Sequence, residues 1–463
     1  MSIKPNEKVR LYSGPSPFET YSKLSKELKT FDFGHGSPDS HPPTFLKDAL
    51  LQATKDEQNQ HQYCRPMGHP EFAAQISKEY SASFNRKLDP QWEICAGVGA
   101  TGIIANALYS FCQKGDELIC FQPCFLGYPP LFHIIGANVK WVPFKDNKLS
   151  QKFELDREAF ERSFTDKTRV VFINNPHNPC GHIFSKEDLE FMASVIKKHP
   201  KVLCIMDEVY DKFVFNGKPF FRMANIPGMW ERTVSIYSSG KVFSCTGWRV
   251  GFSIAPEYLT RMIGSSQTWN IFCMNTLSAK AIQLGMEYAA ENPYEGKASY
   301  YEWLRSTFEW RAKQIGDIIE GSPLGMKMYN PDGGYFTIAN IEDTVKQVPT
   351  KYFYKNQARG SDKPLKYYED WRSLDSPDYA PDSACSIYFT KECGFTTVPV
   401  SAFWDNNPEG NVLDYQGTNF VRFALCKNNT FINRWADDMQ LRNRIRNSKP
   451  NITGLDLTPE PAY

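Results

Sequence analysis

Short runs of apolar, β-branched residues alternate with longer amphipathic segments in the middle of this chain, and this alternation constrains its fold more than any other feature. Four runs have the composition of strands covered on both faces, namely residues 170–174, 202–206, 234–237 and 250–254. A helical pattern at 185–198 separates the first two, with Ser185 placed as its N-cap. Repeated strand-helix-strand units predict an α/β domain with a mostly parallel sheet.

Length and charge limit the class of protein. A chain of 463 residues predicts two domains, because a single core of this size is uncommon. The net charge is +1 and no segment gathers basic residues on one face, so neither nucleic acid nor an anionic membrane is expected as a partner. Residues 1–17 lack the apolar core of a signal peptide, and no apolar run is long enough to span a bilayer. We expect a soluble, cytoplasmic protein, with a mitochondrial isoform as the open alternative.

The twelve cysteines are scattered, and none forms a Cys-x-x-Cys pair. Several lie in apolar runs, which favours buried, reduced thiols. Cys120 and Cys124 are four residues apart but have no partner at a spacing typical of zinc ligands, so no metal site is expected.

Lys241 has the neighbourhood of a residue that binds a phosphorylated aldehyde. Ser238 stands three residues before it and Arg249 eight residues after it. A lysine amine can form a Schiff base with an aldehyde, while a hydroxyl and a guanidinium can bind a phosphate. Pyridoxal phosphate carries both groups. Taken alone, Lys241 could also be a solvated lysine in a turn rich in glycine and serine.

Polar residues follow two other predicted strands, where parallel sheets form their sites. Residues 174–181 contain two Asn-Pro steps, whose amides could donate hydrogen bonds into a cleft or form only a rigid turn. Asp207 follows the run 202–206 and could cap a helix, bind a cation or face a pyridinium nitrogen. In the last case the ion pair is worth roughly 4 kcal/mol at an effective dielectric constant of ~20, which raises the pKa of the ring nitrogen by about three units.

Two upstream segments are weaker signals. The glycine turn 97–102 precedes a helical pattern at 103–111, an arrangement that can direct amide N–H groups at an anion or merely allow close packing. It lacks the full glycine fingerprint of a dinucleotide site. Residues 121–128 place aromatic side chains after another strand, where they could stack on a cofactor ring or fill the core.

Together these motifs resemble one family in their order and spacing. The order is a glycine turn, an aromatic segment, Asn-Pro-x-Asn-Pro, Asp-x-x-Tyr and Ser-x-Gly-Lys followed by Gly-Trp-Arg-x-Gly. Over nearly its whole length the chain is similar to the class I/II aminotransferases, which are fold type I pyridoxal phosphate enzymes. Within them it most resembles the kynurenine aminotransferases, also known as glutamine transaminase K or cysteine-S-conjugate β-lyase, through residues 33–39, 61–63, 333–336, 398–403 and 421–423.

The resemblance implies a role for each residue that matches a family motif. Lys241 would hold the cofactor and move a proton to and from Cα of the substrate. Asp207 would pair with the pyridine nitrogen. Asn178 and Tyr210 would hydrogen-bond the ring oxygen, and Phe125 would stack on the ring.

The resemblance also implies a phosphate site and a partner. The phosphate would be bound by Ser238, Arg249, Ala100 and Thr101. Tyr63 would reach the phosphate held by the neighbouring subunit, which implies a homodimer with shared active sites.

Arg422 would bind the substrate carboxylate in a bidentate ion pair, with Gly36 beside it. Arg422 could otherwise form a surface ion pair near a C-terminal strand. The remaining assigned contacts with the substrate are Asn178, Phe18, Phe125 and Phe272.

Departures from the subgroup in four segments leave the substrate preference open. Ala100-Thr101 stands where Gly-Tyr is usual, and Cys180 stands where threonine is usual. Phe18 replaces a tryptophan, and Phe272-Cys273 replaces a Phe-His pair. The pocket stays apolar and aromatic, so kynurenine, phenylalanine, glutamine and methionine are all candidate substrates.

The expected domains are a large cofactor-binding domain at 50–310 and a small, discontinuous α/β domain at 1–49 and 311–463. An insertion at about 354–384, rich in polar residues and tyrosine, is expected to be a surface excursion, with a lid or partner-binding element as the alternative. The polar tail at 447–463 is expected to be peripheral.

These expectations describe a transaminase, in which an amino acid gives up its amine and a 2-oxo acid collects it. A cysteine-S-conjugate β-lyase, which would use the same site to expel a leaving group from Cβ, is the first alternative. The second is a regulator that binds the cofactor without turnover. It would need a DNA-binding module, for which neither terminus has room.

Overall fold

The computed structural model describes residues 3–10, 12–14, 16–55, 61–353, 380–405 and 419–448. Its larger sheet has eight strands in the order β2-β9-β8-β7-β6-β3-β4-β5. Strands β9 and β5 run antiparallel to the other six. This confirms a mostly parallel sheet. Its strands are β2 (Ile94–Val98), β3 (Glu117–Gln122), β4 (Asn138–Asn147), β5 (Lys152–Leu155), β6 (Thr168–Asn174), β7 (Leu203–Asp207), β8 (Thr233–Ser238) and β9 (Val250–Ile254).

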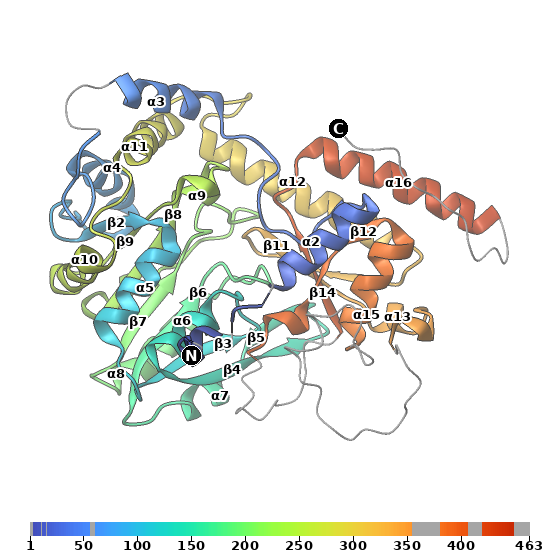
Figure 1. The fold of residues 1–463 in the computed structure, drawn as a ribbon, viewed down its shortest axis with the longest axis horizontal. Helices are drawn as coiled ribbons and strands as arrows, with labels where there is room; N and C mark the ends of the chain where they lie inside the picture. The colour runs from blue at the N-terminus through green and yellow to red at the C-terminus, as the bar shows by residue number, and fades with distance from the viewer. Residues whose placement is uncertain are drawn as a thin grey trace.

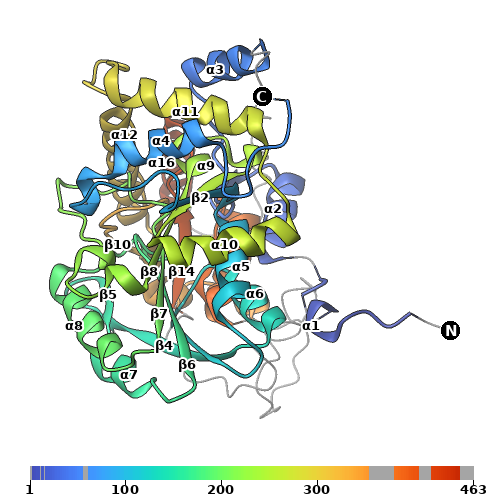
Figure 2. The same ribbon diagram turned by 90° about the vertical axis from the view of Figure 1, so that its left-hand side faces the viewer.

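Alternate residues of the central strands face two separate hydrophobic cores. In β6, Val170 and Phe172 belong to one core, whereas Val171 and Ile173 belong to the other. Because both faces are covered, the strand sequences are apolar at nearly every position. Figure 2 shows helices covering both sides of the sheet. The first face packs on α5 (Gly99–Phe111), α6 (Tyr128–Ile135) and α10 (Glu257–Asn270), and the second on α7 (Arg157–Arg162), α8 (Lys186–Lys197), α4 (Pro70–Tyr80) and α11 (Thr276–Glu291).

Helices α8 and α5 show where local sequence sets a helix boundary and where it does not. Ser185 caps α8, since its Oγ accepts a hydrogen bond from the backbone N–H of Asp188 at 3.0 Å. Helix α5 begins at Gly99, four residues before the helical pattern 103–111. The glycine turn is therefore the first turn of the helix. Its backbone packs on β9 so closely that a Cβ on Gly251 would lie 2.4 Å from the nitrogen of Ala100.

A smaller antiparallel sheet has the strand order β10-β11-β14-β13, and a separate parallel pair joins β1 to β12. Figure 1 shows these strands and their helices beside the larger sheet. Their core includes four aromatic rings with centroids 4.5–6.2 Å apart, those of Phe33, Phe395, Phe423 and Trp435. The elements are β1 (Phe31–Asp32), β10 (Lys327–Tyr329), β11 (Phe336–Asn340), β12 (Phe395–Thr396), β13 (Val398–Pro399), β14 (Phe420–Ala424), α2 (Pro17–Leu28), α12 (Tyr300–Glu320), α13 (Glu342–Val345), α15 (Pro381–Tyr388) and α16 (Asn429–Ser448).

Two helices span the limits predicted for the domains, which stay a prediction. Helix α3 (Thr44–Lys55) crosses residue 50. It packs so closely on α11 that a Cβ added to Gly285 would lie 2.4 Å from Cδ1 of Leu46. Helix α12 crosses residue 310. Residues 354–379 of the predicted insertion at 354–384 lie outside the described residues. The tail beyond residue 448 also lies outside them.

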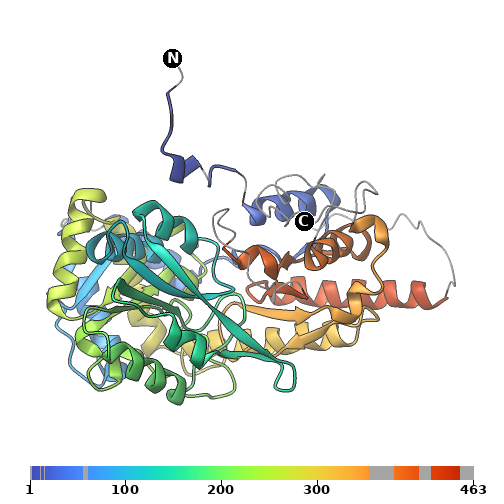
Figure 3. The same cartoon turned by 90° about the horizontal axis from the view of Figure 1, so that it is seen from below.

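The N-terminal segment with α1 (Glu7–Arg10) projects away from the two sheets (Figures 2 and 3). Within the described ranges, none of the helices has the length and apolar composition that a membrane span requires.

Candidate active site

A cavity of about 350 Å³ opens where the carboxyl ends of β6, β7 and β8 meet the smaller sheet. Asp207 and Ser238 end two of these strands and line one side, while Phe336 of β11 and Arg422 of β14 line another. The carboxyl ends of parallel strands lie at one edge of a sheet, so residues far apart in sequence share this cavity. Its size is within the range of small-molecule sites.

The structure brings together all but two of the predicted site residues. Tyr63 and Phe272 do not line the cavity. They lie on the surface, 81% and 49% exposed, with ring centroids 4.9 Å apart. Their contacts with cofactor and substrate stay predictions. The residues that line the cavity are Phe18, Gly36, Ala100, Thr101, Phe125, Asn178, Asp207, Tyr210, Ser238, Lys241, Arg249 and Arg422.

Lys241 lies in the short helix α9 (Ser239–Val242), directly after β8. Its Nζ donates to the backbone oxygen of Gly36 at 3.5 Å. The backbone oxygen of Lys241 accepts a hydrogen bond from the hydroxyl of Tyr335. Burial lowers the pKa of the amine, and the guanidinium groups of Arg422 and Arg249 add to this effect. An amine that loses its proton more readily than an ordinary lysine is suited to attack a carbonyl carbon and to accept a proton.

Asp207 ends β7 and is 4% exposed. Its Oδ2 accepts a hydrogen bond from the hydroxyl of Tyr128, and its Oδ1 accepts one from the backbone N–H of Val209 at 3.3 Å. Burial raises the pKa of Asp207 to about 6, although the bond from Tyr128 opposes the shift. Within the described part of the chain, no lysine, arginine or histidine forms an ion pair with this carboxylate. It can therefore accept a cationic group from a ligand in the cavity.

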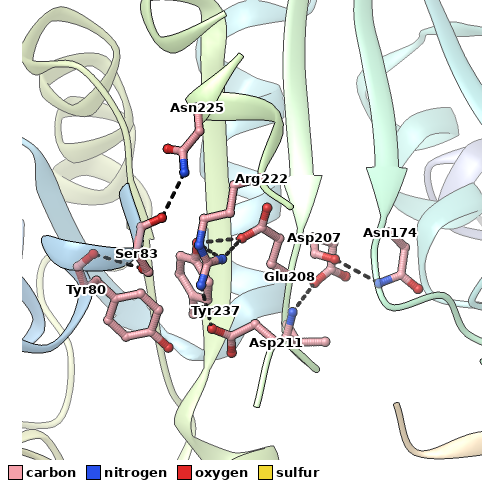
Figure 4. Close-up of polar contacts among 10 residues, drawn as sticks. Tyr80, Ser83, Asn174, Asp207, Glu208, Asp211, Arg222, Asn225 and Tyr237 are labelled. Atoms are coloured by element: carbon pink, nitrogen blue, oxygen red, sulfur yellow. Dashed lines mark hydrogen bonds and ion pairs between the residues drawn. The ribbon is translucent and has the colours of Figure 1, made fainter. Parts of the chain in front are cut away.

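Behind Asp207, a buried ion-pair network ties the ends of β7 and β8 together (Figure 4). Arg222 donates to Oε2 of Glu208, to the hydroxyl of Tyr237 at 2.9 Å and to Oδ2 of Asp211 at 3.1 Å. Tyr237 also donates to Oε2 of Glu208 at 2.6 Å. Glu208 follows Asp207 and Tyr237 precedes Ser238, so the network holds the segments that carry two cavity residues. Sequence reasoning did not single it out.

One end of the cavity is suited to a phosphate. The first turn of α5, which carries Ala100 and Thr101, has no side-chain cap, so its N–H groups can bind an anion with the favourable end of the helix dipole. The guanidinium of Arg249 packs against this turn, since a Cβ on Gly99 would lie only 2.5 Å from its Nη2. Thr246, which the sequence did not indicate, also lines the cavity, as does Ser238.

Arg422 lies in the centre of the cavity wall and is 1% exposed. Its Nη1 donates to Oδ1 of Asn178 at 3.1 Å, its Nη2 donates to the backbone oxygen of Gly34 at 2.6 Å, and its buried Nε has no partner in the described residues. Burial lowers the pKa of the guanidinium to about 9. No described carboxylate forms an ion pair with Arg422, which leaves a buried cation able to bind an anionic ligand.

Aromatic rings enclose the guanidinium of Arg422. Its central carbon lies 3.9 Å from the ring centroid of Phe336, 4.5 Å from that of Phe403 and 4.9 Å from that of Phe18. These rings stabilise the cation and make the adjacent part of the cavity apolar. The predicted Phe18 therefore contacts the predicted carboxylate-binding residue directly.

Tyr210 and Phe125 complete the cavity. Tyr210 is 4% exposed and hydrogen-bonds the side chain of Asn178, and burial raises the pKa of its hydroxyl. The ring of Phe125 lies edge-on to Tyr128 at 5.3 Å. Tyr128 belongs to the aromatic segment 121–128, so a sequence signal existed for it, although its contact with Asp207 was not predicted.

Comparison with known proteins identifies the family. The family model for aminotransferase class I and II matches residues 29–358. Kynurenine–oxoglutarate transaminase from Dictyostelium discoideum is 31% identical over 457 residues, which cover 95% of this chain and 96% of that protein. Kynurenine–oxoglutarate transaminase 3 from Homo sapiens is 30% identical over 414 residues, or 88% of this chain and 84% of that protein.

Solved structures share the fold. Bna3p from Saccharomyces cerevisiae superposes with a TM-score of 0.81 at 23% identity and covers 96% of this chain and 100% of its own. YbdL from Escherichia coli, for which a methionine aminotransferase function is described, has a TM-score of 0.78 at 21% identity and covers 95% and 100%. The chain belongs to the aminotransferase class I and II family and is an enzyme that transfers an amino group between an amino acid and a 2-oxo acid.

Proposed function

We propose that this aminotransferase uses pyridoxal 5'-phosphate to transfer the amino group of a neutral L-amino acid with a bulky or aromatic side chain to a 2-oxo acid. One observation carries the proposal. A single cavity holds the amine of Lys241, the buried carboxylate of Asp207 and the buried guanidinium of Arg422. By their names, the two curated relatives act on kynurenine and oxoglutarate, so kynurenine is the first substrate to test.

The residues of the cavity fit pyridoxal 5'-phosphate. The phosphate would be held by the uncapped first turn of α5 together with Arg249. The guanidinium of Arg249 packs directly against Gly99 in this turn. The buried carboxylate of Asp207 forms no ion pair with a described basic side chain and would pair with the protonated ring nitrogen. When bound, the cofactor supplies temporary storage of an amino group and delocalisation of the electron pair left when Cα loses its proton.

The side chains then have distinct tasks. Lys241 would hold the cofactor through Nζ and, once displaced by the substrate amine, would accept the proton from Cα, since burial lowers the pKa of its amine. Asn178 and Tyr210 would hydrogen-bond the ring oxygen. The Oδ1 of Asn178 is already bonded to Arg422, which leaves its Nδ2 as the donor. Phe125 would cover one face of the ring and exclude water.

The substrate would be oriented by Arg422 and selected by apolar rings. A buried guanidinium whose Nε–H has no partner among the described residues can bind the carboxylate that all amino acids and 2-oxo acids share. Phe18 and Phe336 lie within 5 Å of this guanidinium and would contact the substrate side chain next to its carboxylate. An apolar wall favours neutral, bulky side chains over small polar ones.

We also propose a homodimer whose two cavities each need the neighbouring copy. Large apolar side chains are exposed along α10 and the segments beside it. Trp269 is 88% exposed, Met262 is 48% exposed, and Phe272, whose ring contacts that of Tyr63, follows soon after the end of α10. Exposed aromatic clusters of this kind mark association surfaces. Tyr63 and Phe272 would then reach the phosphate and the substrate of the neighbouring subunit.

The chain is proposed to divide into a large domain at 50–310 and a small domain at 1–49 and 311–463. In support, the eight-stranded sheet lies within the first range, and both smaller sheets lie within the second.

Absorbance tests the cofactor assignment. Purified protein mixed with pyridoxal 5'-phosphate should show the absorbance of the bound cofactor, and Lys241→Ala should lose it while Lys186→Ala, a surface lysine, keeps it. A native protein that stays colourless with excess cofactor would overturn the proposal.

Turnover with kynurenine, phenylalanine, glutamine and methionine, each with a 2-oxo acid, ranks the amino donors. Light scattering should give a dimer that Trp269→Glu dissociates, and a monomeric wild-type protein would refute the shared site. Pyruvate released from a cysteine conjugate without a 2-oxo acid would instead indicate β-lyase activity.

A further inference from the structure

The backbone on the two sides of His35 is hydrogen-bonded to Arg422 and Lys241, the residues proposed to bind the substrate carboxylate and to move its Cα proton. It lies in the loop after β1, flanked by Gly34 and Gly36. The backbone oxygen of Gly34 accepts a hydrogen bond from Arg422 at 2.6 Å, and that of Gly36 accepts one from Lys241 at 3.5 Å. His35 is exposed and lines the cavity, and the backbone on both sides of it is bonded to the two cations.

Because both flanking residues are glycines, His35 supplies the only side chain of the tripeptide 34–36, and it lines the cavity. A Cβ on Gly34 would lie 3.0 Å from Cγ2 of Val398, and a Cβ on Gly36 would lie 2.4 Å from Cζ of Phe336. A side chain at Gly36 would therefore collide with Phe336, and one at Gly34 would be tightly packed against Val398. The backbone N–H of Gly34, at 2.8 Å, and that of His35, at 3.2 Å, both donate to Oδ1 of the neighbouring Asp32, which holds the loop in place.

The imidazole of His35 has no task in the proposed cofactor site. The other titratable side chains of the cavity bind the cofactor, the substrate carboxylate or one another, as described above. The ring of His35 lies edge-on to Phe18 at 6.4 Å, and no hydrogen bond to another described residue satisfies its nitrogens. Its donor and acceptor are therefore available to a ligand.

The charges around His35 favour the neutral imidazole at pH 7. Partial burial of the ring lowers its pKa below the usual 6.5, and the positive charges of Lys427, Arg422 and Lys241 lower it further. Only the carboxylate of Asp32 opposes them. His35 is thus neutral at pH 7 and gains its positive charge at a lower pH than an ordinary histidine.

We propose that His35 is a specificity-determining residue that contacts the side chain of the substrate, as a neutral hydrogen-bonding partner at neutral pH and as the counterion of a side-chain carboxylate when protonated. The inference rests on the proposed function, in which Arg422 binds the carboxylate next to Cα. Neutral imidazole suits a side-chain amide or ketone. Protonated imidazole adds a charge-assisted hydrogen bond to a distal carboxylate, as in a dicarboxylic amino acid or 2-oxo acid.

Equilibrium binding of two matched ligands tests the proposal. Glutarate and its monoamide, glutaramate, share the carboxylate that Arg422 would bind and differ only at the other end. In the cofactor-loaded enzyme, the ratio of their dissociation constants, each calculated for the fully ionised ligand, should shift about tenfold in favour of glutarate between pH of about 8 and about 5.5. Titration of Arg422 or Lys241 affects both ligands and cancels in the ratio. A ratio that does not change with pH in the wild-type enzyme would overturn the proposal.

Variants separate His35 from other groups. His35→Gln keeps a hydrogen-bonding side chain and should bind glutaramate normally, but its ligand ratio should be independent of pH. His41→Gln, an exposed histidine outside the cavity, should behave as the wild type. If His35→Gln retains the pH-dependent ratio, another group binds the distal carboxylate and the proposal fails.

Two readouts keep the inference distinct from the proposed function. Proton NMR of the wild-type enzyme needs no variant, and one imidazole should show a raised pKa with glutarate but not with glutaramate. An unchanged set of imidazole pKa values would refute the proposal. Loss of cofactor absorbance in the wild-type enzyme would refute the proposed function instead.

Discussion

The guanidinium of Arg422 donates a hydrogen bond to the side-chain oxygen of Asn178 at 3.1 Å, across 244 residues of sequence. Arg422 belongs to the smaller sheet, whereas Asn178 follows β6 of the larger sheet. The bond therefore joins the group proposed to bind the substrate carboxylate to a group proposed to bind the cofactor ring. A displacement of one sheet relative to the other would disturb both contacts together.

Arg422→Lys should lower kcat/KM for every amino acid by about 100-fold while the absorbance of the bound cofactor stays unchanged. Lysine keeps the charge but cannot form the planar, bidentate pair or donate to Asn178 and Gly34 at the same time. Steady-state kinetics and absorbance spectra measure the two effects. Arg434→Lys, on the exposed face of α16, is the control. Loss of cofactor absorbance in Arg422→Lys would show that this arginine has another role.

Asp207 should make the cofactor-free protein less stable as the pH rises from about 4 to about 6. Burial raises its pKa from the usual 3.8 to about 6, so over this window the folded protein holds a proton that the unfolded protein releases. The free energy of unfolding should fall by up to ~3 kcal/mol. Asp207→Asn should remove this component, as measured by urea unfolding at several pH values.

The comparison with Asp207→Asn isolates one carboxyl group. Burial also raises the pKa of Asp382, to about 8, but Asp382 is present in both proteins and cancels in the difference. The same slope with pH in wild type and variant would contradict the assignment.

Gly99→Ala should weaken the binding of pyridoxal 5'-phosphate about tenfold or more and leave that of pyridoxal, which lacks the phosphate, nearly unchanged. The added Cβ would stand 2.5 Å from Nη2 of Arg249 and displace the guanidinium from the phosphate end of the cavity. Gly115→Ala is a matched control, since Gly115 also has a positive φ, +93°, but no atom within 4 Å of the added Cβ. Both variants should lose about 1 kcal/mol of stability from backbone strain. Equal affinities for the phosphate form would place the phosphate elsewhere.

Arg222→Met should destabilise the protein by about 3–5 kcal/mol, because it leaves the carboxylate of Glu208 buried without a cation. The double variant with Glu208→Gln should recover much of this loss, since the uncompensated charge is removed. Urea unfolding of the two single variants and the double variant measures the coupling. Additive losses would mean that the contacts in Figure 4 do not act as a pair.

The strands and most of the candidate site could be predicted because their signals are local. The runs that became β6, β7, β8 and β9 are apolar at nearly every position, which only strands covered on both faces require. Each motif also carries its own turn residues, so Lys241 and Asp207 could be placed at strand ends before any contact was known. The cap of α8 by Ser185 follows from a spacing of three residues.

Other features depend on contacts that no local pattern encodes. The start of α5 at Gly99 follows from packing against β9, and glycine has little helix propensity of its own. The ion pair of Arg222 with Glu208 joins residues separated by 14 positions that share no motif. The role inferred for His35 became visible only when the carbonyls on both sides of it were found bonded to Arg422 and Lys241.

The sequence by itself determined the fold class, the family and the chemical groups of the site, because hydrophobic period and motif spacing are properties of short segments. Only the tertiary structure decided which charges are left without a partner. Among the described residues, no basic side chain forms an ion pair with the buried Asp207 and no carboxylate forms one with the buried Arg422, and Tyr63 with Phe272 lies outside the cavity of its own chain. Burial and pairing arise from segments hundreds of residues apart, and they set the pKa values and the ligand affinity of the site.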